Sequence, residues 1–366
     1  MSKARDLFLG GNTCYGFYSF YDFIVSENVL KKYIFKGGPG VGKSFLMKKI
    51  ATEFAARGYD VEYYWCSSDN NSLDGIVLGN KQICLIDGTT PHIVEPKFPG
   101  AVDEIINLGQ FWNKDLITDN RTNIINLTNG VSKCFQRAYL RLQEVNCAYS
   151  ELKTYYEEAS DSSAVKRNII ALSEDFLEAC TKATGKVRHL FSGAITPEGI
   201  VTKLGSIIDK DMSLYTVKGS PGSGVKDLLT YVAYIVEANA IEAEIFHNPF
   251  NPDEIDLILL PETRAVLIDL SDTFLDYSGE ITSTRYKRQL DFDQFIDESI
   301  LDLYVKNIDS AQNRIEFGLK EAITVIAKAK DLHDKLEDYY VPAMDFEAVE
   351  VFYHELLEEI AQNLRI

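Results

Sequence analysis

The sequence predicts an α/β protein of two tandem domains, each with a mostly parallel sheet and a helical hairpin extension. Three observations support this prediction: predicted strands alternate with helices, the chain repeats itself at an offset of about 182 residues, and two long heptad stripes occupy corresponding places. Alternating strands and helices favour a parallel sheet that binds ligands at the carboxyl ends of its strands. With 366 residues and 46% hydrophobic content, the chain can bury two cores.

The first predicted strand and helix flank a glycine-rich loop. A strand at 33–35 precedes the loop, a helix at about 44–57 follows it, and further strands are expected at 61–66 and 83–86. The loop fits the pattern G-x-x-x-x-G-K-[ST] with Gly37, Gly38, Pro39, Gly40, Val41, Gly42, Lys43 and Ser44, and Phe45 continues into the helix. In this context the backbone N–H groups turn inward as an anion nest, and the helix dipole adds positive potential. We therefore expect these nine residues to bind the phosphates of a nucleoside triphosphate.

Three side chains near this loop have predicted roles. Lys43 is expected to reach the β- and γ-phosphates, and the Ser44 hydroxyl to help coordinate Mg²⁺. Asp87 follows four apolar residues, Ile83 to Ile86, so it should end a buried strand near the loop and hold the same metal. The alternative is that Asp87 only caps a turn.

The repeat is chemically unequal. The loop positions recur at 219–226, and Asp87 recurs as Asp269, but Val225 and Lys226 stand where the first copy has Lys43 and Ser44. The second loop is therefore predicted to be degenerate. One residue along a helix rotates a side chain by about 100°, which points Lys226 away from the nest. The alternative, that Lys226 takes over the role of the lost lysine, stays open.

Two loops beside the predicted site carry further candidates. The Pro- and Gly-rich segment 88–100 should overhang the γ-phosphate, which makes His92 and Glu95 candidates for positioning or deprotonating the attacking water, unless they are ordinary surface residues. The polar segment 66–74 is either an acceptor or adenine-side loop or a simple turn. No glutamate follows Asp87 directly, so hydrolysis is expected to be slow or triggered.

Long apolar stripes end each copy. Residues spaced by three and four from Val131 to Tyr156, and again from Ile315 to Tyr340, indicate helices that pack lengthwise on a partner. We expect a hairpin at about 125–183 within a domain of residues 1–186, and another at about 308–364 within a domain of residues 187–366. These arms are candidate surfaces for a protein partner, and the two repeats are expected to pair with each other.

Composition narrows the classes of protein. A net charge of −18 argues against nucleic acid as a partner, because phosphate backbones are bound through clustered Lys and Arg. No apolar run is long enough for a membrane span, and the first residues lack the features of a signal peptide. Six cysteines without metal-binding spacing fit a reducing compartment, so a cytoplasmic location is expected.

These motifs resemble the P-loop NTPase superfamily. The longer signature, from Gly11-Asn12-Thr13 through the loop to Asp87-Gly88-Thr89-Thr90-Pro91-His92, resembles a little-characterised bacterial family of tandem-duplicated P-loop ATPases. That resemblance implies ATP binding with Mg²⁺, whereas Val225 and Lys226 depart from a second catalytic site. The expected function is Mg²⁺-dependent binding of ATP or another nucleoside triphosphate with slow or regulated hydrolysis. A nucleotide- or small-metabolite-kinase-like phosphotransferase and a non-catalytic, nucleotide-gated interaction protein are the alternatives.

Overall fold

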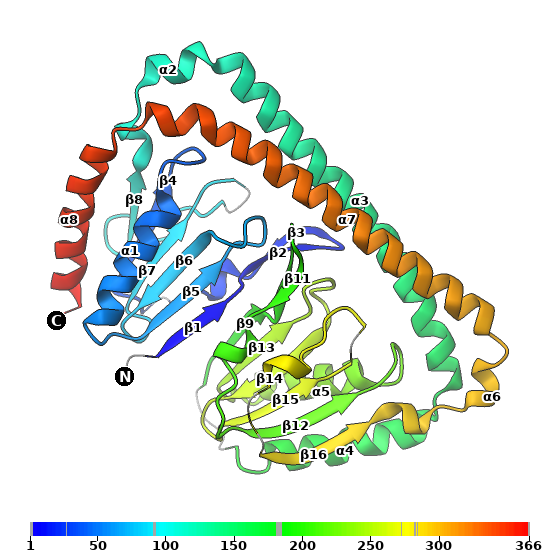
Figure 1. The fold of residues 1–366 in the computed structure, drawn as a ribbon. Coiled ribbons are helices and arrows are strands. Elements are labelled where there is room, and N and C mark those ends of the chain that lie inside the picture. The colour runs from blue at the N-terminus through cyan, green and yellow to red at the C-terminus, as the bar shows by residue number, and fades with distance from the viewer. Residues whose placement is uncertain are drawn as a thin grey trace.

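The protein is an α/β molecule with two six-stranded, mixed but mostly parallel sheets of the same topology (Figure 1). The computed structural model describes residues 3–26, 28–90, 93–180, 185–271, 273–281, 283 and 285–364. Within these ranges, no helix combines the length and the apolar character needed to cross a bilayer.

The first sheet has the strand order β1-β5-β6-β7-β4-β8. Its strands are β1 (Ala4–Leu7), β4 (Lys31–Lys36), β5 (Val61–Trp65), β6 (Leu73–Leu78), β7 (Ile83–Asp87) and β8 (Asp103–Asn107). Only β6 is antiparallel to its neighbours among these strands. The sequence analysis placed residues 73 and 74 in a loop and missed β6, because the aspartate and glycine in this strand interrupt its apolar pattern, although every residue of β6 is buried.

The second sheet repeats this order as β9-β13-β14-β15-β12-β16. Its strands are β9 (Val187–Phe191), β12 (Ser213–Lys218), β13 (Ala243–His247), β14 (Ile255–Leu260), β15 (Ala265–Asp269) and β16 (Tyr286–Asp291). Two small hairpins also correspond, β2 (Gly10–Thr13) with β3 (Gly16–Ser19), and β10 (Gly193–Thr196) with β11 (Gly199–Thr202). The sequence repeat is therefore a repeat of topology.

The helices follow the same two-fold pattern. They are α1 (Lys43–Ala56), α2 (Lys114–Asp119), α3 (Arg121–Ala159), α4 (Ser162–Leu177), α5 (Val225–Ala238), α6 (Glu298–Leu301), α7 (Val305–Tyr340) and α8 (Phe346–Asn363). Short 3₁₀ turns are η1 (Tyr21–Phe23), η2 (Leu108–Phe111), η3 (Leu204–Ser206), η4 (Ser278–Glu280), η5 (Phe292–Phe295) and η6 (Val341–Ala343).

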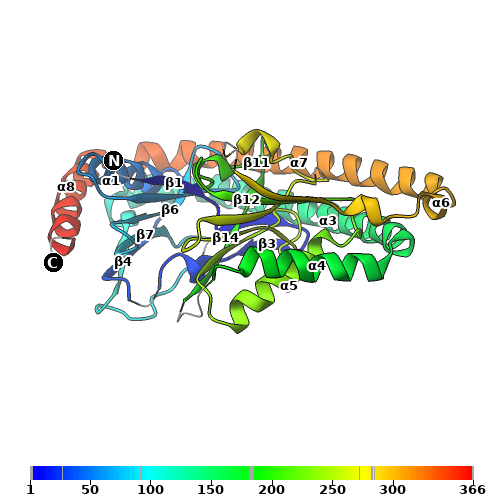
Figure 2. The ribbon, with the colours of Figure 1, turned by 90° about the horizontal axis from the view of Figure 1, so that it is seen from below.

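The predicted helical hairpins within each copy are wrong, because the helices are exchanged between the copies. Helix α3 packs along α7 from the other copy, and the two lie side by side in both views (Figures 1 and 2). Antiparallel pairing is evident from the contacts of Arg141 with Glu321 and of Arg314 with Glu151. Helix α4 packs with α5 on the second sheet, and α8 packs with α1 on the first. A division after residue 186 thus separates the sheets but not the helices that cover them.

Helix lengths explain this exchange. At 1.5 Å per residue, α3 is about 58 Å long and α7 about 54 Å, whereas α4 and α8 span only about 24 and 27 Å. A stripe as long as that of α3 can be covered only by a helix of similar length. Small residues let the pair approach closely, since a Cβ on Gly318 would lie 2.7 Å from Val145.

The two sheets share one apolar core between them. Each sheet turns one face to its helices and the other face to the opposite copy, where buried residues from both halves form a single cluster. The β2–β3 hairpin crosses this boundary, because the Asn12 side chain donates to the carbonyl of Ile195 at 3.0 Å. The predicted pairing of the two repeats therefore takes place within the chain.

A buried ion cluster lies at the same boundary. Arg188 contacts Glu62 at 2.8 Å and Glu244 at 3.2 Å, and Arg5 contacts Glu62 at 3.0 Å and Glu244 at 2.9 Å. The four residues are two repeat-related pairs, so the cluster sits about the pseudo-two-fold axis. Burial would raise the pKa of Glu62, but the two guanidinium groups outweigh burial and hold that pKa far below its usual range.

Two histidines at this boundary, His189 and His247, lead us to expect that the free energy of unfolding falls in acid. The Nδ1 of His247 lies 2.6 Å from the Pro252 carbonyl and its Nε2 lies 2.8 Å from Nδ1 of His189, so the neutral ring has a partner on each side. Burial, with His189 adding to it, lowers the pKa of His247 to about 4. Because the unfolded chain then binds the proton first, this histidine contributes nothing above about pH 6.5 and destabilises the fold progressively below it.

We expect His247 to account for a loss of roughly 3 kcal/mol in unfolding free energy between pH 7 and pH 4. Urea unfolding across this range measures it. His247→Asn should flatten that part of the pH profile, and substitution of the exposed His354 by Gln should not. An unchanged profile for His247→Asn would contradict the prediction.

Candidate functional site

The glycine-rich loop between β4 and α1 has left-handed backbone at two of its glycines. Gly40 and Gly42 have φ angles of +65° and +95°, which L side chains rarely adopt, and α1 begins at Lys43 directly after them. Val41 turns its side chain into the core. Within the described part of the chain, no backbone N–H from Gly38 to Ser44 donates a hydrogen bond to another protein group. These N–H groups therefore have no protein hydrogen bond that an anion would need to replace.

The structure brings together the three side chains predicted around the loop. The Lys43 ammonium donates to the carbonyls of Gly37 and Gly38 at 3.2 and 2.9 Å and lies 3.6 Å from an Asp87 carboxylate oxygen. The Ser44 hydroxyl accepts from the N–H of Leu73 at 2.9 Å, so this oxygen lies at the start of β6.

Thr89 restrains Asp87 and was missed in the sequence analysis. The Asp87 carboxylate accepts the hydroxyl of Thr89 at 2.6 Å and the Thr89 N–H at 2.8 Å. Both bonds go to Oδ1, and Oδ2 is the oxygen nearest Lys43. Asp87 therefore caps the turn that follows β7, which was the alternative interpretation, and it also lies beside the glycine-rich loop.

The donor atoms at this point suit a magnesium ion that is also bound by phosphates. Ser44 and Asp87 offer a hydroxyl and a carboxylate, the hard oxygen donors that Mg²⁺ prefers. Among the described residues, no group of three or more His, Cys, Asp or Glu side chains could hold a metal by itself. An ion held here would need further ligands, such as phosphate and water oxygens.

The two candidates for water activation have different outcomes. His92 lies outside the described residues. Glu95 accepts from the Lys36 ammonium at 2.8 Å, and its side chain is 67% exposed. The same ammonium donates to the carbonyls of Gly88 and Val94, so Lys36 holds the segment after β7 against the end of β4. A catalytic role for Glu95 stays a prediction.

The polar segment after β5 is organised by its own hydrogen bonds. The Asp69 carboxylate accepts from the Asn71 N–H at 3.0 Å and from the Ser72 hydroxyl at 2.9 Å, which forms a tight turn. Burial, with Asp74 adding to it, raises the pKa of the Cys66 thiol well above its usual value. A buried, protonated thiol is a poor nucleophile, which agrees with the turn interpretation.

The end of α7, which belongs to the second half of the chain, lies over the first loop. A Cβ on Gly38 would come within 2.5 Å of the Tyr340 ring, and one on Gly40 would meet Val341 at 2.8 Å and Glu337 at 3.2 Å. Lys330 adds a contact of 3.6 Å to Asp69. The sequence analysis did not predict this contact, because these residues lie about 300 positions from the loop in sequence. They reach the loop only through the packing of α3 along α7.

Gly38→Ala tests this cover. The backbone of Gly38 is not left-handed, so alanine causes no backbone strain there. The substitution should destabilise the fold only because the new methyl group meets Tyr340. We expect a loss of about 1–3 kcal/mol in unfolding free energy, as for overpacked sites. The double variant with Tyr340→Ala should lose about 0.5–3 kcal/mol less than the sum of the losses of the two single variants, because the clash is then absent. Gly279→Ala, with open space around it, is the matched control; additive effects of the first two substitutions would contradict the contact.

The second loop keeps the backbone of the first but not its open N–H groups. Gly222 and Gly224 have φ angles of +90° and +113°, matching Gly40 and Gly42. However, the Gly219 N–H donates to the Ser271 hydroxyl at 3.0 Å, and the Ser220 N–H donates to the Asp293 carboxylate at 2.6 Å.

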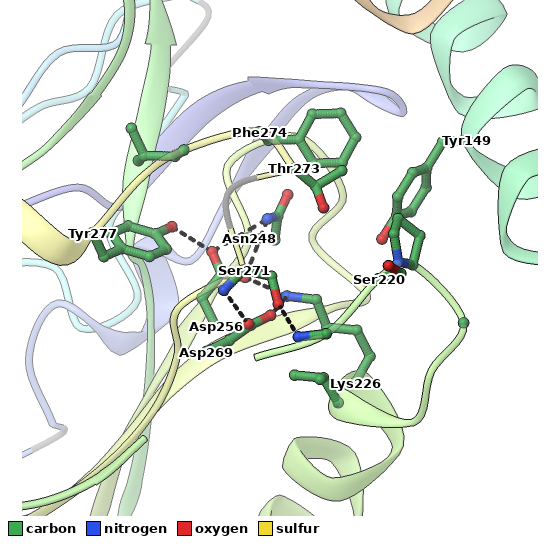
Figure 3. A pocket seen from close by; sticks show the side chains of 15 residues that line it. Tyr149, Ser220, Lys226, Asn248, Asp256, Asp269, Ser271, Thr273, Phe274 and Tyr277 are labelled. Atoms are coloured by element: carbon green, nitrogen blue, oxygen red, sulfur yellow. Dashed lines mark hydrogen bonds and ion pairs between the residues drawn. The ribbon is translucent and has the colours of Figure 1, made fainter. Parts of the chain in front are cut away.

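Lys226 shares one contact with Lys43, because it lies beside Asp269, the counterpart of Asp87, but among the described residues it does not donate to the loop carbonyls as Lys43 does. The Lys226 ammonium lies 2.6 Å from Asp256 and 2.9 Å from Asp269 (Figure 3). The cavity above it has a volume of about 30 Å³, which is room for one or two water molecules. The space directly beside Lys226 is therefore too small for a nucleotide, whereas a larger cavity of about 800 Å³ lies on the outer side of the same loop, lined by Gly219, Ser220 and Pro221.

Comparison with protein-family models, with curated proteins and with solved structures found no match for this chain.

Proposed function

We propose that the first copy binds ATP or another nucleoside triphosphate with Mg²⁺ and hydrolyses it slowly. The observation that carries this proposal is the loop from Gly37 to Ser44, whose N–H groups have no protein partner in the described residues while Lys43 lies between loop carbonyls and Asp87. An open nest with an adjacent ammonium suits a polyphosphate, because the nest supplies several donors and Lys43 a full positive charge.

Each residue would then have one task. The loop N–H groups bind the phosphate oxygens, and the Lys43 ammonium leaves its carbonyl partners to bind the β- and γ-phosphates. Ser44 and Asp87 would hold Mg²⁺, which when bound neutralises charge on the phosphate oxygens. Thr89 fixes the Asp87 carboxylate in the orientation this needs. In hydrolysis a water oxygen bonds to the γ-phosphorus as the bond from that phosphorus to the β–γ bridging oxygen breaks, and the water proton passes to the products.

Slow turnover follows from the surroundings of the reacting phosphate. No glutamate follows Asp87 in sequence, and the Glu95 carboxylate is already paired with Lys36. The second copy serves as a non-hydrolysing partner, because Val225 replaces the phosphate-binding lysine and Asp293 takes one of its loop N–H groups.

Titration calorimetry with Mg²⁺ and the non-hydrolysable ATP analogue AMP-PNP tests the proposal. We expect binding at one site per chain that is weakened by EDTA, with slow phosphate release when ATP is used. No heat with ATP, GTP or the analogue would overturn the proposal.

A non-catalytic, nucleotide-gated role is the second candidate. The contacts of Tyr340 and Glu337 with the loop favour it, since a nucleotide entering the nest must meet the end of α7. Tight binding without phosphate release would support this alternative.

A further inference from the structure

The second copy contains a permanent positive charge at a defined point. The Lys226 ammonium donates to Asp256 at 2.6 Å, to the Ile255 carbonyl at 3.3 Å, and lies 2.9 Å from Asp269. Both carboxylates are almost fully buried, with side chains only 2% and 5% exposed. Three oxygens from β14 and β15 thus surround one nitrogen, and Figure 3 shows the two carboxylates among them beside Lys226.

The repeat shows which first-copy groups occupy the same places. At an offset of 182, Lys226 corresponds to Ser44, Asp256 to Asp74, and Asp269 to Asp87. The supporting frames agree, because strand order, pairing and the two left-handed glycines are the same in both copies. The ammonium of the second copy therefore lies where the first copy presents a hydroxyl and two carboxylates.

We propose that Lys226 is a tethered cation that occupies, in the second copy, the position of the divalent metal ion of the first. This inference rests on the proposed function for the location of the metal. It adds Asp74, a buried residue of β6, as a carboxylate facing that metal in the first copy. It also removes the need for magnesium in the second copy, since Lys226 supplies a positive charge to both carboxylates from within the chain.

The surroundings of Lys226 favour a fixed structural charge, and they argue against a side chain that moves to bind phosphate. Asp256 also accepts from the hydroxyls of Ser192 and Tyr277, at 2.7 and 2.5 Å, and from the Asn248 amide at 3.1 Å. Burial alone would lower the pKa of Lys226, but Asp256 and Asp269 more than reverse this and raise it well above its ordinary value. An ammonium held in this way stays charged and stays in place.

Substitution of Lys226 by Ser tests the proposal, because it recreates the first-copy arrangement. In EDTA, and without nucleotide, we expect Lys226→Ser to melt roughly 5–15 °C below the wild type, since two buried carboxylates lose their counter-ion. Mg²⁺ or Mn²⁺ should restore most of this difference. Mn²⁺ binding measured by electron paramagnetic resonance should rise by one ion per chain relative to the wild type.

Lys226→Met is the matched control. Its side chain fills the same space without charge or hydroxyl, so it should melt low in EDTA and gain no more from divalent ions than the wild type does. If Lys226→Ser folds only when a divalent ion is present, the proposal is supported. If it gains no ion and no stability from Mg²⁺ or Mn²⁺, or does not fold even with them, the proposal is overturned.

This test is independent of nucleotide. Failure of the proposed function would appear as absent ATP binding by the wild type, whereas failure of the tethered-cation proposal would appear as absent rescue of Lys226→Ser. A double variant, Val225→Lys with Lys226→Ser, restores the Lys-Ser pair in the second copy. Calorimetry then measures whether this variant binds more than one nucleotide per chain.

Discussion

Lys43→Met is expected to weaken binding of Mg²⁺ and AMP-PNP, and to slow phosphate release, by about 10²–10³-fold. The substitution keeps the length of the side chain but removes an ammonium that lies 3.2 and 2.9 Å from loop carbonyls and 3.6 Å from Asp87. Charge-assisted bonds to phosphate are roughly twice as strong as neutral ones, so their loss should dominate the change. Calorimetry and a phosphate-release assay measure it.

Lys49→Met is the matched control for this prediction. Lys49 lies on the same helix, but its ammonium pairs with Glu350 at the surface, where an ion pair contributes little. We expect this variant to bind the analogue within about two-fold of the wild type. Equal losses for both lysines, or no loss for Lys43→Met, would contradict the proposed nucleotide site.

Arg188→Met is expected to reduce the free energy of unfolding by about 3–5 kcal/mol. The guanidinium is 9% exposed and bonds to Glu62, Glu244 and the backbone carbonyls of η1 residue Phe23 and of Ile24. Without it, the two buried carboxylates at the boundary between the copies would be left with Arg5 and with the half-exposed Lys81, whose ammonium lies 3.8 Å from Glu244. Urea unfolding at pH 7 measures the loss, and adding Glu62→Gln should recover part of it by removing the excess charge.

Arg264→Met provides the comparison. Arg264 also contacts two carboxylates, Asp209 at 3.1 Å and Asp211 at 2.5 Å, but its side chain is 47% exposed. Water screens that pair, so we expect a loss below about 1 kcal/mol. The buried cluster should also depend on pH: because the arginines hold the pKa of Glu62 and Glu244 below their usual range, its contribution is complete above the ordinary carboxyl pKa and is lost as the pH falls. Equal losses for the two arginines would contradict the role of burial.

Local patterns in the sequence were sufficient for much of the fold and the site. The order of strands and helices around the first loop, the carboxylate at the end of β7 and the second copy of the whole arrangement each depend on residues close in sequence. The position of Lys43 beside Asp87 follows from this local geometry, because the loop and β7 belong to adjacent parallel strands.

The helical arms were predicted wrongly for a physical reason. Heptad spacing shows that a helix needs a partner, but it does not say which apolar stripe that partner carries. The choice of α7 for α3 is decided by matching lengths and by the position of each helix end on the opposite sheet. The cover of the first loop by Tyr340 is a consequence of this choice.

The amino-acid sequence by itself determined the α/β class, the duplication, the glycine-rich pattern of the first loop and the change of Lys-Ser to Val-Lys in the second, because each can be read from the order of residues along the chain. Only the tertiary structure decided the exchange of helices, the Arg188 cluster and the contact of Lys226 with Asp256 and Asp269. Those depend on which distant segments meet when the buried faces of both copies close together, and the distances that result set the strength of each charge interaction.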